Sequence, residues 1–259
     1  MPRSSIDDSS IDDANATPHA HREVVSYVHR GGRMTDGQEQ AWDRWWPVYG
    51  RAMGRIAASG GDEPSDSPAS EDDLDLEAWF GRRAPVMFEI GSGMGESTAA
   101  LAAAAPDVDH LAVEVYQPGL GQLLMRIQEQ GLTNLRLLRA DAVIVLREHI
   151  AADSLAGVRI YFPDPWPKRR HHKRRLVQPE FVALATSRIA PGGTLHMATD
   201  WAHYADQMRE VCDAAPSLRP ERAPGEDWTL RPPWRPLTKF EQRAVNEGRM
   251  VRDLIYRRV

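Results

Sequence analysis

A proline-rich stretch that runs into a basic stretch is the part of this sequence with the strongest chemical character. Residues 162–175 read FPDPWPKRRHHKRR, so one carboxylate, Asp164, stands among three prolines and a tryptophan. Proline fixes φ and lacks an amide hydrogen, so the stretch can neither continue a strand nor lie inside a helix. We expect a stiff loop that holds one acid beside an anion-binding surface.

The composition of the whole chain limits its class. The 259 residues, 42% of them hydrophobic, suit one large domain with or without an added arm, and the net charge of −5 does not by itself indicate nucleic-acid binding. The single cysteine, Cys212, excludes an internal disulfide, and the acidic start lacks the apolar run of a signal peptide. We expect a cytoplasmic protein without membrane contact; monomer and homodimer remain equally open.

Composition changes along the chain divide it into four parts. Residues 1–22 predict a disordered acidic tail, and residues 23–56 an N-terminal arm with a helix. Residues 57–80 are rich in Gly, Ser, Pro and Asp, which is typical of a flexible linker or insertion, and residues 81–259 form the main domain. The arm helix should begin at Thr35 or Asp36. We interpret its tryptophans as core packing rather than as base-stacking platforms; they are Trp42, Trp45 and Trp46.

Within the main domain, strand-like and helix-like segments alternate. The expected strands are 86–90, 110–115, 135–139, 158–162 and 193–198, and the expected helices are 96–105, 119–130, 143–150, 179–189 and 202–214. Repeated β–α units predict an α/β fold with a doubly wound, mostly parallel sheet. The last segment, 249–257, has β-forming residues with no helix after it, so it predicts a closing antiparallel strand.

Ligands of such sheets bind outside the carboxyl ends of the strands. The first strand ends in Glu89 and a glycine turn, Gly91, Gly93 and Gly95, whose spacing differs from the GxGxxG of dinucleotide folds. A carboxylate there repels phosphate but suits a ligand with an ammonium and a sulfonium group. A generic strand–helix turn is the alternative.

Acids also end the later strands. Glu114 follows the glycine turn at about the 20-residue interval of a ribose-hydroxyl acceptor. Asp141 can accept from an adenine amino group or cap the helix that follows it, and Asp200 can likewise cap a helix. Helix capping alone does not predict acids at the ends of five successive strands.

Together these motifs resemble those of the bacterial tRNA (guanine-N7-)-methyltransferases of the TrmB type, over about residues 24–259. The resemblance rests on EIGSGMG, AVEVYQPG, FPDPWPKRRHHKRR, TDW and TKFE. It implies a class I, Rossmann-like methyltransferase fold and S-adenosylmethionine as cofactor. It also implies transfer of a methyl group to N7 of guanosine 46 in the variable loop of tRNA. The acidic segment 62–77 is longer than the family leads us to expect.

The resemblance also implies roles for individual residues. Asp164 would be catalytic. The implied cofactor contacts are Glu89, Gly91, Gly93, Gly95, Glu114, Asp141 and Asp164. The implied substrate contacts are Lys168, Asp200, Thr238, Lys239, Phe240 and Glu241. The implied RNA contacts are Arg30, Arg33, Arg169, Arg170, His171, His172, Lys173, Arg174 and Arg175. No metal site is expected, because His171 and His172 stand among cations.

The implied chemistry suits these residue types. Guanine N7 carries a lone pair, so the protein need only place it in line with an activated methyl group and exclude water. Asp164 would then stabilise the positive charge that develops on the purine, rather than act as an obligatory base. Asp200 and Glu241 are acceptors that match the N1–H and amino group of guanine. Thr238 and Glu241 can equally form a helix capping box.

Other classes of function remain as alternatives. The glycine spacing and Glu89 argue against an NAD-dependent enzyme. A methyltransferase that acts on another RNA or on an exocyclic amine would share much of this pattern, although amine methyltransferases usually carry two consecutive prolines. A non-catalytic RNA-binding subunit is the third alternative, and cofactor binding would distinguish it.

Overall fold

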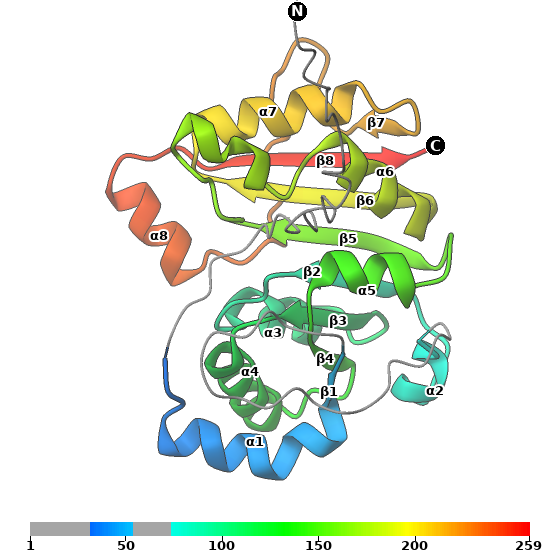
Figure 1. Ribbon diagram of the computed structural model, residues 1–259, viewed down its shortest axis with the longest axis vertical. Coiled ribbons are helices and arrows are strands. Elements are labelled where there is room, and N and C mark those ends of the chain that lie inside the picture. Colours follow the sequence, from blue (N-terminus) through cyan, green and yellow to red (C-terminus); the bar gives the residue numbers. More distant parts are fainter. Residues whose placement is uncertain (1–31, 54–73) are drawn as a thin grey trace, which may run out of the picture.

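The computed structural model describes residues 32–53 and 74–259, so the predicted tail, Arg30 and most of the 57–80 segment lie outside the described residues. An eight-stranded sheet crosses the molecule in the order β1-β4-β3-β2-β5-β6-β8-β7 (Figure 1). Its strands are β1 (Gly50–Ala52), β2 (Val86–Ile90), β3 (Asp109–Glu114), β4 (Leu135–Arg139), β5 (Leu155–Tyr161), β6 (Ile189–Thr199), β7 (Leu218–Pro220) and β8 (Arg252–Arg258).

Strand pairing confirms the predicted sheet. Strands β1, β4, β3, β2, β5 and β6 pair in parallel, and β8 runs antiparallel between β6 and β7. Strand β8 begins at Arg252 rather than at Arg249, because the Arg249 amide still bonds to Ala244 O at the end of the preceding helix. The chain crosses over at the β2–β5 pair, which is where a doubly wound sheet places its ligand.

The helices form two groups. They are α1 (Asp36–Tyr49), α2 (Leu76–Phe80), α3 (Glu96–Ala104), α4 (Gln117–Gln130), α5 (Ala142–Glu148), α6 (Pro179–Arg188), α7 (Ala202–Asp213) and α8 (Lys239–Asn246), with a 3-10 helix, η1, at Arg169–Arg174. Helices α1, α3 and α4 contribute to one apolar cluster, and α5, α6 and α7 to another. Neighbouring strand residues divide between them: Leu111 and Val113 belong to the second cluster, and Ala112 to the first. Because strand side chains alternate, the two clusters cover opposite faces of the sheet.

The N-terminal segment is joined to this sheet. Thr35 caps α1 in a capping box with Gln38, and β1 pairs with β4 at the sheet edge. The tryptophans of α1 pack against the α4 side of the core, which confirms their interpretation: Trp42 stacks on Trp46 at 4.0 Å, and Trp45 Nε1 donates to Gln128 Oε1.

One part of the predicted linker is helical. Residues 76–80 form α2, which Asp75 caps by accepting from Ala78 N. Its Phe80 is buried. The linker interpretation of these five residues was therefore wrong. Asp75 caps the short helix, and the buried Phe80 packs it on the domain.

Candidate cofactor and substrate site

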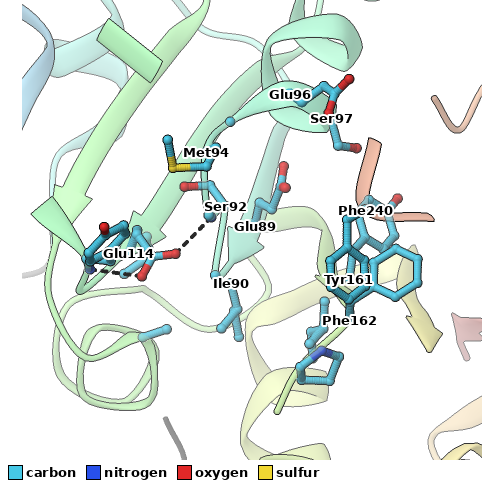
Figure 2. Close-up of a pocket in the computed structure, with 18 of the residues that line it drawn as sticks. Glu89, Ile90, Ser92, Met94, Glu96, Ser97, Glu114, Tyr161, Phe162 and Phe240 are labelled. Atoms are coloured by element: carbon cyan, nitrogen blue, oxygen red, sulfur yellow. Dashed lines mark hydrogen bonds between the residues drawn. The ribbon is translucent and has the colours of Figure 1, made fainter. Parts of the chain in front are cut away.

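A cavity of about 710 Å³ opens at the carboxyl ends of β2, β3 and β5. This volume falls within the usual range for a small-molecule site. Two sets of residues line it. One, which we call the cofactor wall, comprises Glu89, the Gly91–Gly95 turn, Glu114 and Asp141. The other, the substrate wall, comprises Tyr161, Phe162, Pro163, Asp164, Arg235, Thr238, Lys239, Phe240 and Arg243. Figure 2 shows Glu114 on one side and the rings of Tyr161, Phe162 and Phe240 on the other.

The glycine turn has the tight geometry that its spacing predicts. Gly91, Gly93 and Gly95 have φ values of 74°, 55° and 71°, a region that glycine enters without steric cost. The turn also approaches α4 closely, because a Cβ on Gly119 would lie 2.2 Å from Gly93 O. The contact therefore requires glycine at position 119, whereas glycine at position 93 is favoured by its positive φ.

Glu114 holds the turn in place. Its Oε2 accepts from Gly93 N at 2.8 Å, and its Oε1 accepts from Val115 N at 2.8 Å and Tyr116 N at 3.0 Å (Figure 2). Glu114 also lines the cavity. The carboxylate thus both fixes the loop and faces the cavity.

Glu89 is the most deeply placed acid of the cavity. Thr98 Oγ1 donates to its Oε1 at 2.9 Å, while its Oε2 is buried without a hydrogen-bond partner among the described residues. Burial raises the pKa of Glu89, and the nearby Arg159 opposes that shift. A buried acceptor without a partner is costly, so this atom is placed to receive a donor from a ligand.

Asp141 caps a helix, which confirms one of its two predicted roles. Its Oδ1 accepts from Val143 N at 2.8 Å and so caps α5, and its side chain lines the cavity. Capping orients the carboxylate. The contact of Asp141 with a cofactor stays a prediction.

The loop that carries Asp164 has unusual backbone conformations on both sides of that residue. Phe162 and Trp166 have φ values of 53° and 44°, which bulky residues rarely adopt. Asp164 lies between them and lines the cavity. Such strain persists only where surrounding contacts impose it, and it clusters at functional sites.

The basic stretch after this loop is not a loop throughout, so that part of the prediction was wrong. Arg169–Arg174 form η1, since no proline follows Pro167 to prevent a helical turn. Five cationic side chains of residues 168–174 are exposed: Lys168, Arg169, Arg170, Lys173 and Arg174. Arg174 lies over the Trp166 ring at 4.9 Å, and partial burial, with neighbouring arginines, lowers the pKa of His171 and His172.

Arg175 requires a correction. It is buried, its Nε donates to Pro165 O at 2.8 Å, and its Nη1 donates to Gln207 Oε1 at 2.7 Å. The guanidinium also lies over the Tyr204 ring. A side chain occupied in this way joins the loop to α7 and cannot reach a phosphate, so its assignment as an RNA contact was wrong.

Two predicted guanine acceptors are also occupied. Glu241 is 1% exposed and ion-paired with Arg231 and Arg235, and Asp200 is ion-paired with Arg249. Paired with cations, Glu241 is unavailable to guanine, so that role was wrong. Asp200 and Lys168 lie outside the described cavity lining.

The expected helix caps are partly confirmed. Thr238 caps α8 by accepting from Glu241 N at 3.2 Å. Glu241 does not complete a capping box, because arginines hold its carboxylate. Trp201, not Asp200, occupies the cap position of α7.

Sequence reasoning missed several residues of the substrate wall. Tyr161, Arg235 and Arg243 line the cavity beside Thr238, Lys239 and Phe240. Lys239 N donates to Glu96 Oε2 at 3.0 Å, which joins α8 to the first turn of α3. Arginines are common on surfaces, so the residue type alone did not distinguish Arg235. Its position shortly before the TKFE motif was the one local signal that could have done so.

Two negative findings concern the described ranges. Across residues 32–53 and 74–259, no three His, Cys, Asp or Glu side chains gather as a metal site would require. No helix in those ranges has the length and apolar character to cross a membrane.

Comparison with known proteins bears on this geometry. A family model described as "Putative methyltransferase" matches residues 83–254. A tRNA (guanine-N(7)-)-methyltransferase of Streptomyces coelicolor is 46% identical over 94% of this chain and 84% of its own length. One from Pseudomonas aeruginosa is 45% identical over 100% of this chain and 98% of its own length. This chain belongs to the tRNA (guanine-N(7)-)-methyltransferase family.

Solved structures agree on the fold. The crystal structure of the 16S rRNA methyltransferase KamB aligns with a TM-score of 0.52 at 15% identity, over 72% of this chain and 95% of that chain. At that identity the likeness concerns the fold alone. The chain has the class I methyltransferase fold, and its family membership makes it a methyltransferase.

Proposed function

We propose that this protein transfers a methyl group from S-adenosylmethionine to N7 of guanosine 46 in the variable loop of tRNA. One observation carries the proposal. One cavity is lined both by the acids of the cofactor wall and by Asp164, and a row of exposed cations begins four residues after Asp164, at Lys168. Family membership supplies the reaction class and the tRNA substrate class.

The residues of the cofactor wall fit S-adenosylmethionine. The Glu89 Oε2 atom, which is buried without a hydrogen-bond partner among the described residues, matches the ammonium of the methionine part. Glu114 lines the cavity, and its carboxylate would accept from ribose hydroxyls. The glycine turn removes side chains where the ligand must approach the backbone. When bound, the cofactor supplies a methyl group already activated by a sulfonium.

Asp164 would act on the purine. Guanine N7 has a lone pair and no proton to lose, so a positive charge would develop on guanine as N7 gained the methyl group that the sulfonium would release. A carboxylate fixed in a strained loop stabilises that charge without having to reorganise. Phe240, which is 51% exposed and lies 4.9 Å from the Phe162 ring, offers a face on which the base can stack.

The exposed cations of residues 168–174 would bind tRNA phosphates. Such contacts position the substrate without reading its sequence, and their strength falls with salt. Arg33 is exposed and belongs to the same proposed set. Thr238, Lys239 and Lys168 stay proposed substrate contacts.

Methyl transfer from labelled S-adenosylmethionine to two unmodified tRNA transcripts tests the proposal. One transcript carries guanosine at position 46, and its matched control carries adenosine there. We expect label in the first and background in the second. Equal label in both would move the target to another base, and no label in either, with the cofactor still bound, would contradict the tRNA substrate.

A further inference from the structure

A group of buried and half-buried polar side chains lies in the substrate wall and directly behind it. We call Tyr161, His196, Asp253, Arg235 and Glu241 the polar bridge. Arg235, Asp253 and His196 are 2%, 1% and 1% exposed. The bridge connects three strands, β5, β6 and β8, with helix α8, which stands away from the sheet in Figure 1.

Arg235 is the centre of the bridge. Its Nη1 donates to Glu241 Oε2 at 2.6 Å, and its Nη2 donates to Glu241 Oε1 at 2.8 Å and to Asp253 Oδ2 at 2.9 Å. Its Nε lies 2.8 Å from Asp253 Oδ1, an ion-pair distance without a hydrogen bond. One guanidinium thus joins a helix carboxylate to a strand carboxylate.

The remaining members extend the bridge to the cavity. Asp253 Oδ1 contacts His196 Nε2 at 2.8 Å, and His196 Nδ1 contacts the Tyr161 hydroxyl at 2.9 Å. Burial lowers the pKa of His196, so the ring is neutral, donates to Asp253 and accepts from Tyr161. Tyr161 itself lines the cavity.

The bridge is not explained by stability alone. Removing charges from water is costly, and apolar side chains of similar size often stabilise a protein as well or better. What charged pairs add is a defined relative position. Bidentate arginine–carboxylate contacts are the most directional of these.

The position that the bridge defines is that of α8. Glu241 follows Phe240 directly, and Thr238 and Lys239 form the start of the same helix. Arg235 also lies over the rings of Tyr161 and Phe162, at 5.9 Å and 6.0 Å. The guanidinium therefore sets the distance between the strand-end residues beside Asp164 and the helix start that faces them.

We propose that Arg235 is a positioning residue that holds α8 against the cavity so that the target base is aligned with Asp164. This inference rests on the proposed function. It assigns Arg235 no contact with substrate; the effect passes through Glu241 to Phe240 and Thr238. A misplacement of about 1 Å far from the reacting atoms can lower a rate by about 100-fold.

The test compares Arg235→Lys with Arg222→Lys. Arg222 makes the matched control because it also binds a carboxylate through two nitrogens, to Asp213 at 3.0 Å and 2.8 Å, away from the cavity. We measure the thermal midpoint, the cofactor Kd, single-turnover methyl transfer to the guanosine-46 transcript, and hydrogen exchange of the α8 amides. Glu241→Gln, which keeps the shape but removes the charge, serves as a second variant if Arg235→Lys does not fold.

For Arg235→Lys we expect at least about a 10-fold slower single-turnover rate, faster exchange in α8, and a cofactor Kd within about 3-fold of wild type. Arg222→Lys should stay within about 2-fold on every measure. A wild-type rate and α8 exchange in folded Arg235→Lys would overturn the inference, as would equal losses of cofactor affinity and rate. If the wild-type protein does not methylate tRNA, the proposed function fails separately, and α8 exchange alone decides whether Arg235 fixes the helix.

Discussion

The two walls of the cavity are held by different kinds of contact. The cofactor wall is fixed by backbone conformation, with three left-handed glycines and a carboxylate, Glu114, that binds three backbone amides. The substrate wall is fixed by side-chain ion pairs, such as Arg235 with Asp253. We therefore expect cofactor binding to depend on the backbone geometry of the glycine turn, and base alignment to depend on side-chain ion pairs. Changes in one wall should therefore leave the other largely intact.

Asp164→Ala should give the largest difference between an effect on the substrate wall and an effect on the cofactor wall. The variant should lower the single-turnover rate by about 100- to 1000-fold, because a fixed charge opposite the developing cation is lost. The cofactor Kd, measured by calorimetry, should change little. Equal losses in rate and in cofactor affinity would count against a role in the chemical step.

Gly119→Ala tests the cofactor wall alone. The added methyl would lie 2.2 Å from Gly93 O, so the turn or α4 must shift. We expect about a 10-fold weaker cofactor Kd and a loss of about 1–3 kcal/mol of stability. Gly131→Ala is the control, because a Cβ there meets open space. Its positive φ of 64° should lower stability and leave the cofactor Kd unchanged. A normal cofactor Kd for Gly119→Ala would show that the turn tolerates the shift.

Two neighbouring arginines on the substrate side should give opposite results. Arg174→Ala should weaken tRNA binding a few-fold and reduce the salt dependence by about one phosphate contact, since Arg174 is exposed. Arg175→Ala should instead lower the free energy of unfolding by about 2–4 kcal/mol, because its buried hydrogen-bond partners lose their donor. Titrations at several salt concentrations, with denaturant unfolding, separate the two effects. A smaller salt dependence of tRNA binding for Arg175→Ala would show instead that Arg175 contacts a phosphate.

The smallest effect concerns His110, a buried residue near the start of β3 that lies outside the cavity lining. Burial, with Arg159 nearby, lowers the pKa of His110 to about 3. Since the unfolded chain protonates this ring near pH 6.5 and the folded chain does not, stability is lost as the pH falls through 6.5 toward 3. Between pH 7 and pH 5.5 the loss should be about 1 kcal/mol. His110→Gln should remove that part of the pH dependence of unfolding, and identical slopes would contradict the assignment.

Sequence reasoning worked best where a short motif imposes its own geometry. The glycine spacing predicted a tight turn, and the Thr35 and Thr238 caps predicted where α1 and α8 begin. It failed for Arg175 and Glu241, which stand in runs of polar residues that look exposed. Burial of a charged residue depends on partners elsewhere in the chain. Those partners are Gln207 for Arg175, and Arg235 for Glu241.

The sequence by itself determined the alternation of strands and helices, the glycine turn, the acids at the strand ends and the stiff loop around Asp164. Each of these follows from residue type and near-neighbour spacing, through backbone sterics and the loss of amide donors at proline. Only the tertiary structure decided which charges remain available. It exposed Arg174, buried Arg175, and committed Glu241 to Arg235. The physical reason is that the cost of removing a charge from water, and the partner that offsets it, depend on three-dimensional surroundings that local sequence does not define.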